Sequence, residues 1–238
     1  LRGSFDYYRK ETSDLFQSLP LSAITGTSSL AANTGSMHNN GFDFDLTYDL
    51  VRGADLNVSL TAVGNINDNY LANLPSETGI IEGIGRNGGP LGERYDVRYA
   101  GVNPANGNEM FLDIDGNLTE TPNEDTDRVW SGKNVAPEMQ GSFSLNADYK
   151  GFFIQSQFNY TLGVDFSDFD YQRLMNGNNI SQFNLSSDIL RSWTPDNRVT
   201  DVPNIQNGSN AGVYSSDRFL VDRDYLRLRF LSFGYNFP

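Results

Sequence analysis

The 238-residue sequence predicts an all-β fold, a transmembrane antiparallel β-barrel with long extracellular loops and short periplasmic turns. Three observations predict it. Apolar and polar residues alternate with a period of two, the pattern of a strand with one apolar and one polar face. Very short turns alternate strictly with long connections. Most alternating segments are nine to eleven residues long, which suits strands that cross an outer membrane.

The first predicted strand runs from Arg2 to Glu11, so the chain reads as strand almost from its first residue and is expected to be a fragment. The second, residues 42–50, predicts an apolar and an acidic face. After a tight-turn composition at 52–55, the alternation resumes over 56–66. On the second strand the apolar residues are Phe42, Phe44, Leu46, Tyr48 and Leu50, and the polar ones are Asp43, Asp45, Thr47 and Asp49.

A second hairpin with the same alternation is expected at 141–149 and 152–162, around Lys150-Gly151. The last predicted strand, 224–237, changes phase between Leu228 and Leu231, which predicts a one-residue bulge near Arg229-Phe230. Aromatic residues near the strand ends suit the interfacial girdles of a barrel: Tyr48, Tyr149, Phe152, Tyr160 and Tyr235.

Long connections rich in Gly, Asn, Pro and Ser separate the strand segments: residues 12–40, 67–137 and 164–222. Loops of this length are uncommon in compact soluble domains. Short turns at one end and long loops at the other are typical of an outer-membrane barrel, although the alternation by itself also fits a soluble sandwich. Within the loops, residues 94–102 alternate weakly, and Asp115-Gly116 has the composition of a hairpin turn.

Composition excludes several classes of protein. Thirty acidic and seventeen basic residues give a net charge of −13, so no basic footprint for nucleic acid is present. The aromatic content of 13% argues against a disordered chain. There is no cysteine, and the single histidine, His38, is expected to be a solvated loop residue. Thiolate zinc sites, cysteine nucleophiles and paired-histidine metal sites are therefore excluded.

Two possible chemical sites carry less weight than their structural alternatives. Asp43 and Asp45 share a strand face about 6.6–7 Å apart, within the ~6.5–9.5 Å separation of an inverting glycosidase. Thr47 and Asp49 continue that face, however, which favours a polar lumen wall. Residues 113–117 resemble the start of a calcium loop but depart from the EF-hand pattern, so a hairpin turn is favoured.

No catalytic, metal or cofactor-binding residue is predicted. The glycine spacing at 83–88 lacks the strand–helix context of a phosphate loop. Aromatic residues in the long loops are the only plausible ligand contacts, because flat rings stack on sugars or anchor peptides. They are Trp130, Tyr171, Trp193 and Tyr214. No one of them is singled out, and a structural role is favoured for Trp193.

Several short motifs are spread along the chain, at residues 3–10, 20–21, 33–35, 40–43, 89–92, 99–104, 113–117, 149–152, 191–197, 225–229 and 231–238. In their order and spacing they resemble the C-terminal part of the barrel of SusC/RagA-type TonB-linked outer-membrane proteins, the nutrient importers of Bacteroidota. A departure is Phe230, where family members often carry Asn.

The resemblance implies a bacterial outer-membrane importer of oligosaccharides or peptides, with a 22-stranded barrel, an N-terminal plug, a TonB-contacting segment and a SusD-like surface lipoprotein. Residues 1–238 would supply about six spanning strands, without the plug, the first barrel half or the last strands. Six strands cannot close in lipid, so the chain is expected to belong to a longer one. The alternative is a secreted all-β carbohydrate-binding module or glycosidase domain.

The alternation also predicts which residues face lipid and which face the lumen. Those expected to face lipid are Phe42, Phe44, Leu46, Leu60, Leu145, Ile154 and Phe158, and those expected to face the lumen are Asp43, Asp45, Asn57, Asn146 and Gln157.

Overall fold

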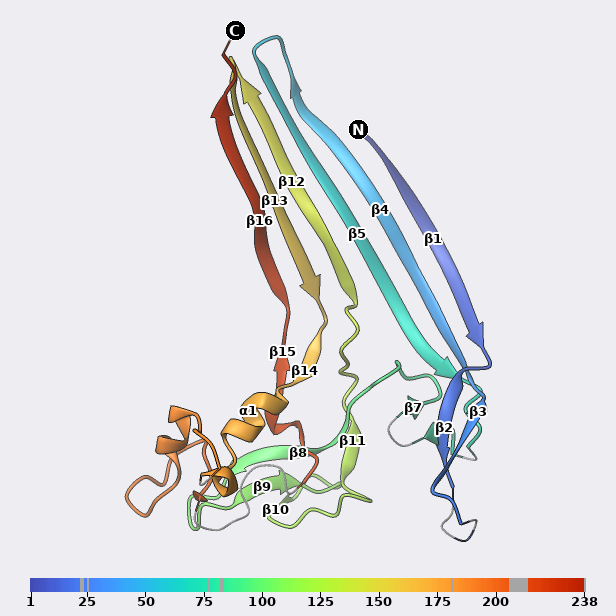
Figure 1. Ribbon diagram of the computed structural model, residues 1–238, viewed down its shortest axis with the longest axis vertical. Helices are drawn as coiled ribbons and strands as arrows, with labels where there is room; N and C mark the ends of the chain where they lie inside the picture. Colours follow the sequence, from blue (N-terminus) through green and yellow to red (C-terminus); the bar gives the residue numbers. More distant parts are fainter. Residues whose placement is uncertain are drawn as a thin grey trace. The chain divides into compact units, whose positions relative to one another are not determined.

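The computed structural model describes residues 1–21, 24, 26–76, 78–81, 84–180, 182–205 and 214–237. The chain forms two compact units (Figure 1). Unit 1 comprises Leu1–Glu93, Gly132–Asp165 and Asp222–Pro238, and unit 2 comprises Arg94–Ser131 and Phe166–Val221. In the described part of the chain, no helix has the length and apolar character needed to span a membrane.

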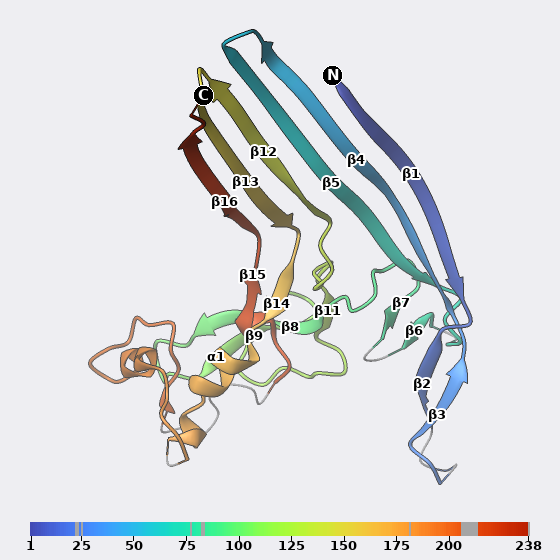
Figure 2. The same cartoon turned by 45° about the horizontal axis from the view of Figure 1, so that its top comes forward.

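Unit 1 is built on one six-stranded sheet in the order β1-β4-β5-β12-β13-β16, with all neighbours antiparallel. The sheet is open, with β1 and β16 at its edges (Figure 2). Its strands are β1 (Arg2–Ser13), β4 (Ser36–Arg52), β5 (Leu56–Ala72), β12 (Met139–Tyr149), β13 (Phe152–Leu162) and β16 (Tyr225–Tyr235). The predicted all-β character is therefore confirmed, and this sheet is not a closed barrel.

The β12–β13 hairpin matches the prediction closely. Tyr149 pairs with Phe152, and the two residues between them have left-handed backbones, Lys150 at φ 47° and Gly151 at φ 90°. This is the backbone that a two-residue hairpin turn requires. The other tight turn closes at Gly53, whose N–H donates to the Leu56 carbonyl at 2.9 Å.

Strands β4 and β5 are longer than predicted. Each has 17 residues, and their ladder continues to the pair Ser36–Ala72. The expected loop boundaries at residues 40 and 67 were therefore wrong. His38 is also not a solvated loop residue: it lies in β4, is 9% exposed, and stacks on Tyr70 with ring centroids 4.8 Å apart. The alternation of apolar and polar residues in β4 stops at Gly41. The hydrogen-bonded pairing of β4 with β5 continues beyond it, because backbone pairing does not depend on side-chain polarity.

Two bulges keep the faces of the sheet consistent. Phe158 pairs with Leu228 and Gln157 with Phe230, which leaves Arg229 as the extra residue. The bulge predicted near Arg229-Phe230 is confirmed. A second bulge at Leu50 was not predicted; it lies between the paired residues Asp49 and Val51.

The sheet has two chemically distinct faces. Directly paired residues share a face, so the pairings extend each strand's alternation across the sheet. The apolar face includes Phe5, Phe42, Phe44, Leu46, Leu60, Phe143, Leu145, Ile154, Phe158 and Phe233. The polar face includes Asp6, Asp43, Asp45, Thr47, Asn57, Ser59, Thr61, Asn65, Asn146 and Gln157. The two predicted sets thus lie on opposite faces.

The apolar face remains largely exposed. Leu60 and Ile154 are each 41% exposed and Phe233 is 79% exposed. In a soluble sandwich these side chains would form the core and lose most of that exposure. The described buried clusters lie elsewhere, in the connections and at one end of β5.

Two paired glycines, Gly64 and Gly141, lie in the middle of the apolar face. Phe44 and Tyr160 pair with them from the flanking strands. The Tyr160 hydroxyl would lie only 2.7 Å from a Cβ placed on either glycine. The bare backbone therefore provides the space that these two aromatic side chains occupy.

We expect Gly141→Ala to destabilise the folded protein by about 1–3 kcal/mol, the usual cost of overpacking. The new Cβ would collide with the Val63 carbonyl oxygen, and rotation of a side chain cannot relieve a clash with backbone. Chemical denaturation of the folded protein measures the loss. Ser142→Ala, one residue further and on the other face, is the control and should cost much less; equal stability of Gly141→Ala and wild type would contradict the packing role.

At the end of the sheet opposite the tight turns, unit 1 carries two small hairpins and a buried cluster. The hairpins are β2 (Phe16–Pro20) with β3 (Ser29–Asn33) and β6 (Ile80–Ile81) with β7 (Gly85–Arg86). The cluster consists of Leu71, Leu74 and Ile81, with Leu15, Leu19, Met37 and Ile84 packed against it.

Unit 2 contains a small sheet in the order β10-β9-β8-β11 and several short helices. Its strands are β8 (Tyr95–Val102), β9 (Glu109–Leu112), β10 (Leu118–Thr119) and β11 (Arg128–Trp130). The helices are α1 (Phe169–Leu174) and the 3₁₀ turns η2 (Gly177–Asn179), η3 (Ser187–Arg191) and η5 (Asp217–Phe219). A short β14 (Asp165–Ser167) pairs with β15 (Leu220–Asp222).

Candidate functional site

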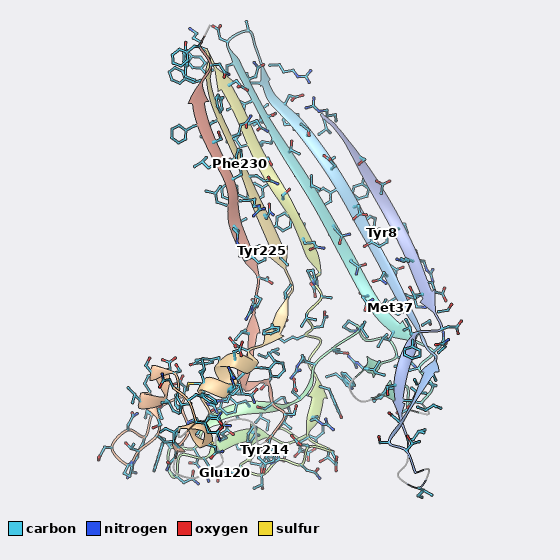
Figure 3. All side chains as sticks on the ribbon, viewed as in Figure 1. Tyr8, Met37, Glu120, Tyr214, Tyr225 and Phe230 are labelled. Atoms are coloured by element: carbon cyan, nitrogen blue, oxygen red, sulfur yellow. The ribbon has the colours of Figure 1, made fainter. Side chains whose placement is uncertain are left out.

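Polar side chains of neighbouring strands hydrogen-bond to one another on the polar face of the sheet. Tyr8 lies on β1 (Figure 3). Its hydroxyl donates to Asn67 Oδ1 at 2.9 Å and accepts from Asn65 Nδ2 at 3.1 Å. Asn65 Nδ2 also donates to Asp43 Oδ1 at 2.6 Å. Three strands thus join their polar side chains directly, and Thr47 and Thr61 bond across the same face at 3.1 Å. Such a surface is suited to water and polar solutes.

A depression of about 300 Å³ lies in unit 1 at this network. It is lined by Ser4, Asp6, Asp43, Phe44, Asp45, Val63, Gly64, Asn65, Gln140 and Gly141. Three of these residues are aspartates, which makes the depression acidic. Asp49 continues the acidic face and is bridged to Arg52 at 2.5 Å, so Asp43 and Asp45 belong to a wall rather than to an isolated carboxylate pair.

Phe230 lies on this face in the edge strand β16 (Figure 3). It pairs with Gln157 and is 47% exposed. The bulge at Arg229 causes this placement, because the extra residue shifts the phase of the strand. Phe230 therefore adds an exposed aromatic side chain to a mainly polar face.

Unit 2 is organised around a buried ion pair, Arg218 with Glu109, whose side chains are 8% and 6% exposed. The Arg218 guanidinium also lies over the rings of Tyr99 and Phe219, at 5.2 and 4.8 Å from their centroids. Burial raises the pKa of Glu109, and Arg218 opposes that rise. Burial likewise raises the pKa of Tyr99 to about 12. The pair ties η5 to the small sheet.

A second connection joins η5 to β8. The Tyr99 N–H donates to Asp217 Oδ1 at 2.7 Å, and the Val97 N–H donates to the Ser215 carbonyl at 2.9 Å. Burial raises the pKa of Asp217, although the Tyr99 hydrogen bond acts in the opposite direction. Segments more than one hundred residues apart in sequence are thereby joined within unit 2.

The loop aromatics mostly have structural partners. Trp193 is 8% exposed and donates its indole N–H to the Pro104 carbonyl at 3.1 Å, which confirms the structural role favoured for it. Tyr171 donates to Asp188 Oδ2 at 2.9 Å, and Tyr214 packs edge-on against Phe111. Trp130 stacks on Tyr95 with ring centroids 4.5 Å apart. The structure does not gather these four residues around one pocket.

The calcium-like segment 113–117 forms a hairpin turn, as favoured from the sequence. The Asn117 N–H donates to Asp113 Oδ1 at 2.7 Å, and hydrogen bonds from Asn117 lower the pKa of Asp113. Glu120 accepts from the side-chain amides of Asn103, Asn106 and Asn108, which lowers its pKa. Among the described residues, no group of three or more His, Cys, Asp or Glu side chains could hold a metal ion.

The glycine-rich segment 83–88 is not a phosphate loop in its described part. Gly83 lies outside the described residues, and Gly85-Arg86 form β7, paired with β6. Asn87 then accepts a hydrogen bond from the Leu74 N–H at 3.0 Å. The segment therefore serves to fix the connection that follows β5.

Comparison with known proteins gives sequence relatives and structural neighbours. No protein-family model matches the chain. The chain is 28% identical over 262 residues to TonB-dependent receptor P3 of Formosa agariphila, covering 99% of the chain and 25% of the receptor. It is 24% identical over 290 residues to TonB-dependent receptor P39 of the same organism, covering 100% of the chain and 28% of that receptor.

Among solved structures, the chain is similar to the RagAB peptide transporter, with a TM-score of 0.78 and 29% identity over 98% of this chain and 26% of that one. The RagAB peptide importer in its open-open state gives a TM-score of 0.81 and 28% identity over 99% of this chain and 26% of that one. The chain thus spans about a quarter of the length of the proteins it matches.

Proposed function

The chain resembles the SusC/RagA-type TonB-linked outer-membrane proteins in sequence and in fold, and from this premise we propose that it forms part of the barrel of a TonB-dependent nutrient importer in the bacterial outer membrane. The six strands of unit 1 supply barrel wall. The long connections, including unit 2, supply extracellular loops at the mouth. The assignment is to transport, and no catalytic role is proposed.

The observation that carries this proposal is the pair of faces on the open sheet. An exposed apolar face suits lipid, and a hydrogen-bonded polar face suits an aqueous lumen. The relatives add support, because their names are those of receptors and of an importer. In lipid the open edges of β1 and β16 need strand partners, which further strands of the longer protein would supply.

The substrate and partners follow from the same resemblance. The substrate is an oligosaccharide or a peptide, and the similarity to RagAB, a peptide transporter, favours the peptide. A SusD-like surface lipoprotein covers the extracellular mouth. Energy arrives from the inner membrane through TonB, which acts on a plug outside residues 1–238.

The alternative, a secreted carbohydrate-binding module or glycosidase domain, makes a different experimental prediction. A folded outer-membrane barrel in detergent migrates faster on a gel before heating than after it. The full-length protein that contains this chain is expected to show this heat-dependent shift. Identical migration of heated and unheated samples would favour the soluble alternative.

Cysteine labelling of intact cells tests the proposed topology, since residues 1–238 contain no cysteine. With an impermeant probe, Asn123→Cys in unit 2 should react from outside. Ala54→Cys, in the tight turn after β4, should react only after the outer membrane is permeabilised. Asn207, in the long connection 164–222 that is also predicted to be external, lies outside the described residues.

A strain that lacks the surface lipoprotein is the control for shielding of Asn123 by a partner. Reaction of Ala54→Cys in intact cells, together with protection of Asn123→Cys in that strain, would overturn both the orientation of the sheet and the role of the loops.

A further inference from the structure

The apolar face of unit 1 changes character abruptly on three neighbouring strands. Tyr7, Phe42 and Ile66 form one paired row on this face. Two residues further along each strand, the next row on the same face is Arg9, Asn40 and Asp68. The row after that is Glu11, His38 and Tyr70. No gradual transition separates the apolar rows from the polar ones.

The opposite face changes in the reverse sense. Asn65 and Asn67 belong to the polar network around Tyr8. Beyond them on that side lie the paired residues Met37 and Leu71, and Leu71 is fully buried in the apolar cluster with Leu74 and Ile81. Met37 lies near the beginning of β4 (Figure 3). These ends of β4 and β5, beyond Gly41 and Ile66, therefore have the polarity of a water-soluble protein, apolar where they are covered and polar where they are not.

The backbone pairing of β5 changes at the same level. β12 begins at Met139, whose partner on β5 is Ile66. Further along, Leu71 donates its N–H to the Gly89 carbonyl at 2.9 Å and accepts from the Gly88 N–H at 2.8 Å, and this partner segment is irregular. Irregular backbone exposed to lipid is not tolerated in the hydrocarbon region, so this part of β5 fits an aqueous setting.

The apolar segment that precedes the change has the length of a membrane crossing. From Leu56 to Ile66 the strand rises about 33 Å at ~3.3 Å per residue. A tilt of ~35–45° reduces this to about 23–27 Å, close to the ~25 Å apolar band of outer-membrane barrels. At the tight-turn end of the apolar face, one row of paired residues is mostly aromatic. It consists of Leu56, Tyr149, Phe152 and Tyr235.

We propose that the hydrocarbon core of the bilayer ends on β1, β4 and β5 between two neighbouring rows of paired residues. The last row inside the hydrocarbon is Tyr7, Phe42 and Ile66, and the first row outside it is Arg9, Asn40 and Asp68. This inference rests on the proposed outer-membrane function and deepens it by assigning the lipid boundary. The acyl chains contact the apolar face as far as Tyr7, Phe42 and Ile66. Beyond this boundary, the ends of β1, β4 and β5 stand outside the hydrocarbon as a wall that supports the connections.

Depth-dependent quenching on β5 tests the boundary. Leu60→Cys, Ile66→Cys and Asp68→Cys are made one at a time in a cysteine-free full-length protein, labelled with bimane and refolded into phosphatidylcholine vesicles. Acyl-brominated lipid should quench the label at Leu60 and Ile66, which aqueous iodide should reach poorly. The label at Asp68 should show the reverse. Heat-dependent gel migration establishes that each labelled variant has folded.

Ser59→Cys, next to Leu60 but on the polar face, is the matched control, and its label should respond to iodide and not to brominated lipid. Lipid quenching at Asp68 as strong as at Ile66 would overturn the boundary while leaving the importer proposal intact. Lipid quenching at none of the positions, Leu60 included, would overturn the proposed outer-membrane function itself.

Discussion

Replacing Leu60 with arginine is expected to destabilise the folded protein in a bilayer by about 2–4 kcal/mol, the cost of a basic residue on the lipid face near the midplane. Leu60 lies midway along the apolar segment of β5, between Tyr48 and Leu145 on the same face. Its side chain is 41% exposed on the sheet, so the charge would enter lipid rather than a protein core. Denaturant titration of the full-length protein folded into liposomes gives the loss.

The matched control is Ser59→Arg, one residue away at almost the same depth. Ser59 pairs with Asp49 and Asn146 on the polar face, where a guanidinium finds water and a carboxylate. We expect little loss of stability. Asn57, the control that the sequence suggests, pairs with Arg52 and would add like-charge repulsion, so Ser59 gives the cleaner comparison. Similar losses for Leu60→Arg and Ser59→Arg would refute the assignment of the two faces.

The strand segments of nine to eleven residues could be predicted from the sequence. Each face of such a strand meets the same environment, apolar or polar, along its whole length. Lipid on one side and water on the other favour alternation of apolar and polar residues, which is strict from Phe158 to Leu162. The bulge at Arg229 could be predicted for the same reason. Without an extra residue, the apolar residues before and after it would lie on opposite faces of the strand.

The ends of β4 and β5 beyond Gly41 and Ile66 could not be predicted in this way. There the polarity of both faces inverts, so the alternation between Ser36 and Gly41 no longer follows the pattern of the rest of the strand. Backbone pairing continues without it. The bulge at Leu50 left a weak signal, the adjacent apolar residues Leu50 and Val51, which fit a single face only if one residue is extra.

The polar network and the centre of unit 2 depend on partners far apart in sequence. Tyr8 meets Asn65 and Asn67, and Arg218 meets Glu109, across connections whose path no local pattern encodes. Periodicity assigns a residue to a face, but it does not identify the residue that will lie opposite. For this reason the loop aromatics stood out in the sequence, whereas the buried ion pair did not.

Removing Arg218 is expected to have the largest effect within unit 2. Arg218→Met leaves the Glu109 carboxylate buried without its cation, and breaking a buried pair in this way costs about 3–5 kcal/mol. The cation–π contacts with Tyr99 and Phe219 are lost with it. Hydrogen exchange of the β8 and β9 backbone in the full-length protein measures the free energy of opening of this unit. A tenfold faster exchange corresponds to about 1.4 kcal/mol.

The loss should depend on pH in a definite direction. Burial raises the pKa of Glu109 above its usual 4.5, so the folded unit binds the proton more tightly than the unfolded chain does. The stability linked to this group is fully present below the unfolded pKa and is lost as pH rises through the raised folded pKa. Arg218 opposes the rise, so the folded pKa of Glu109 should be higher still in Arg218→Met. The deficit of the variant should therefore be large at neutral pH and shrink when Glu109 is protonated.

Two further variants separate the ion pair from simple loss of packing. Glu109→Gln removes the titrating group but leaves the Arg218 charge buried, so it should be destabilised without this pH dependence. The double variant Arg218→Met/Glu109→Gln removes both charges and should lose less than the two single losses combined, because no unpaired charge remains buried. The measurement is the hydrogen-exchange rate of the β8 and β9 backbone, corrected for the intrinsic effect of pH on exchange. If the loss of stability in Arg218→Met were the same at neutral and acidic pH, Glu109 would not be the group left without its partner charge.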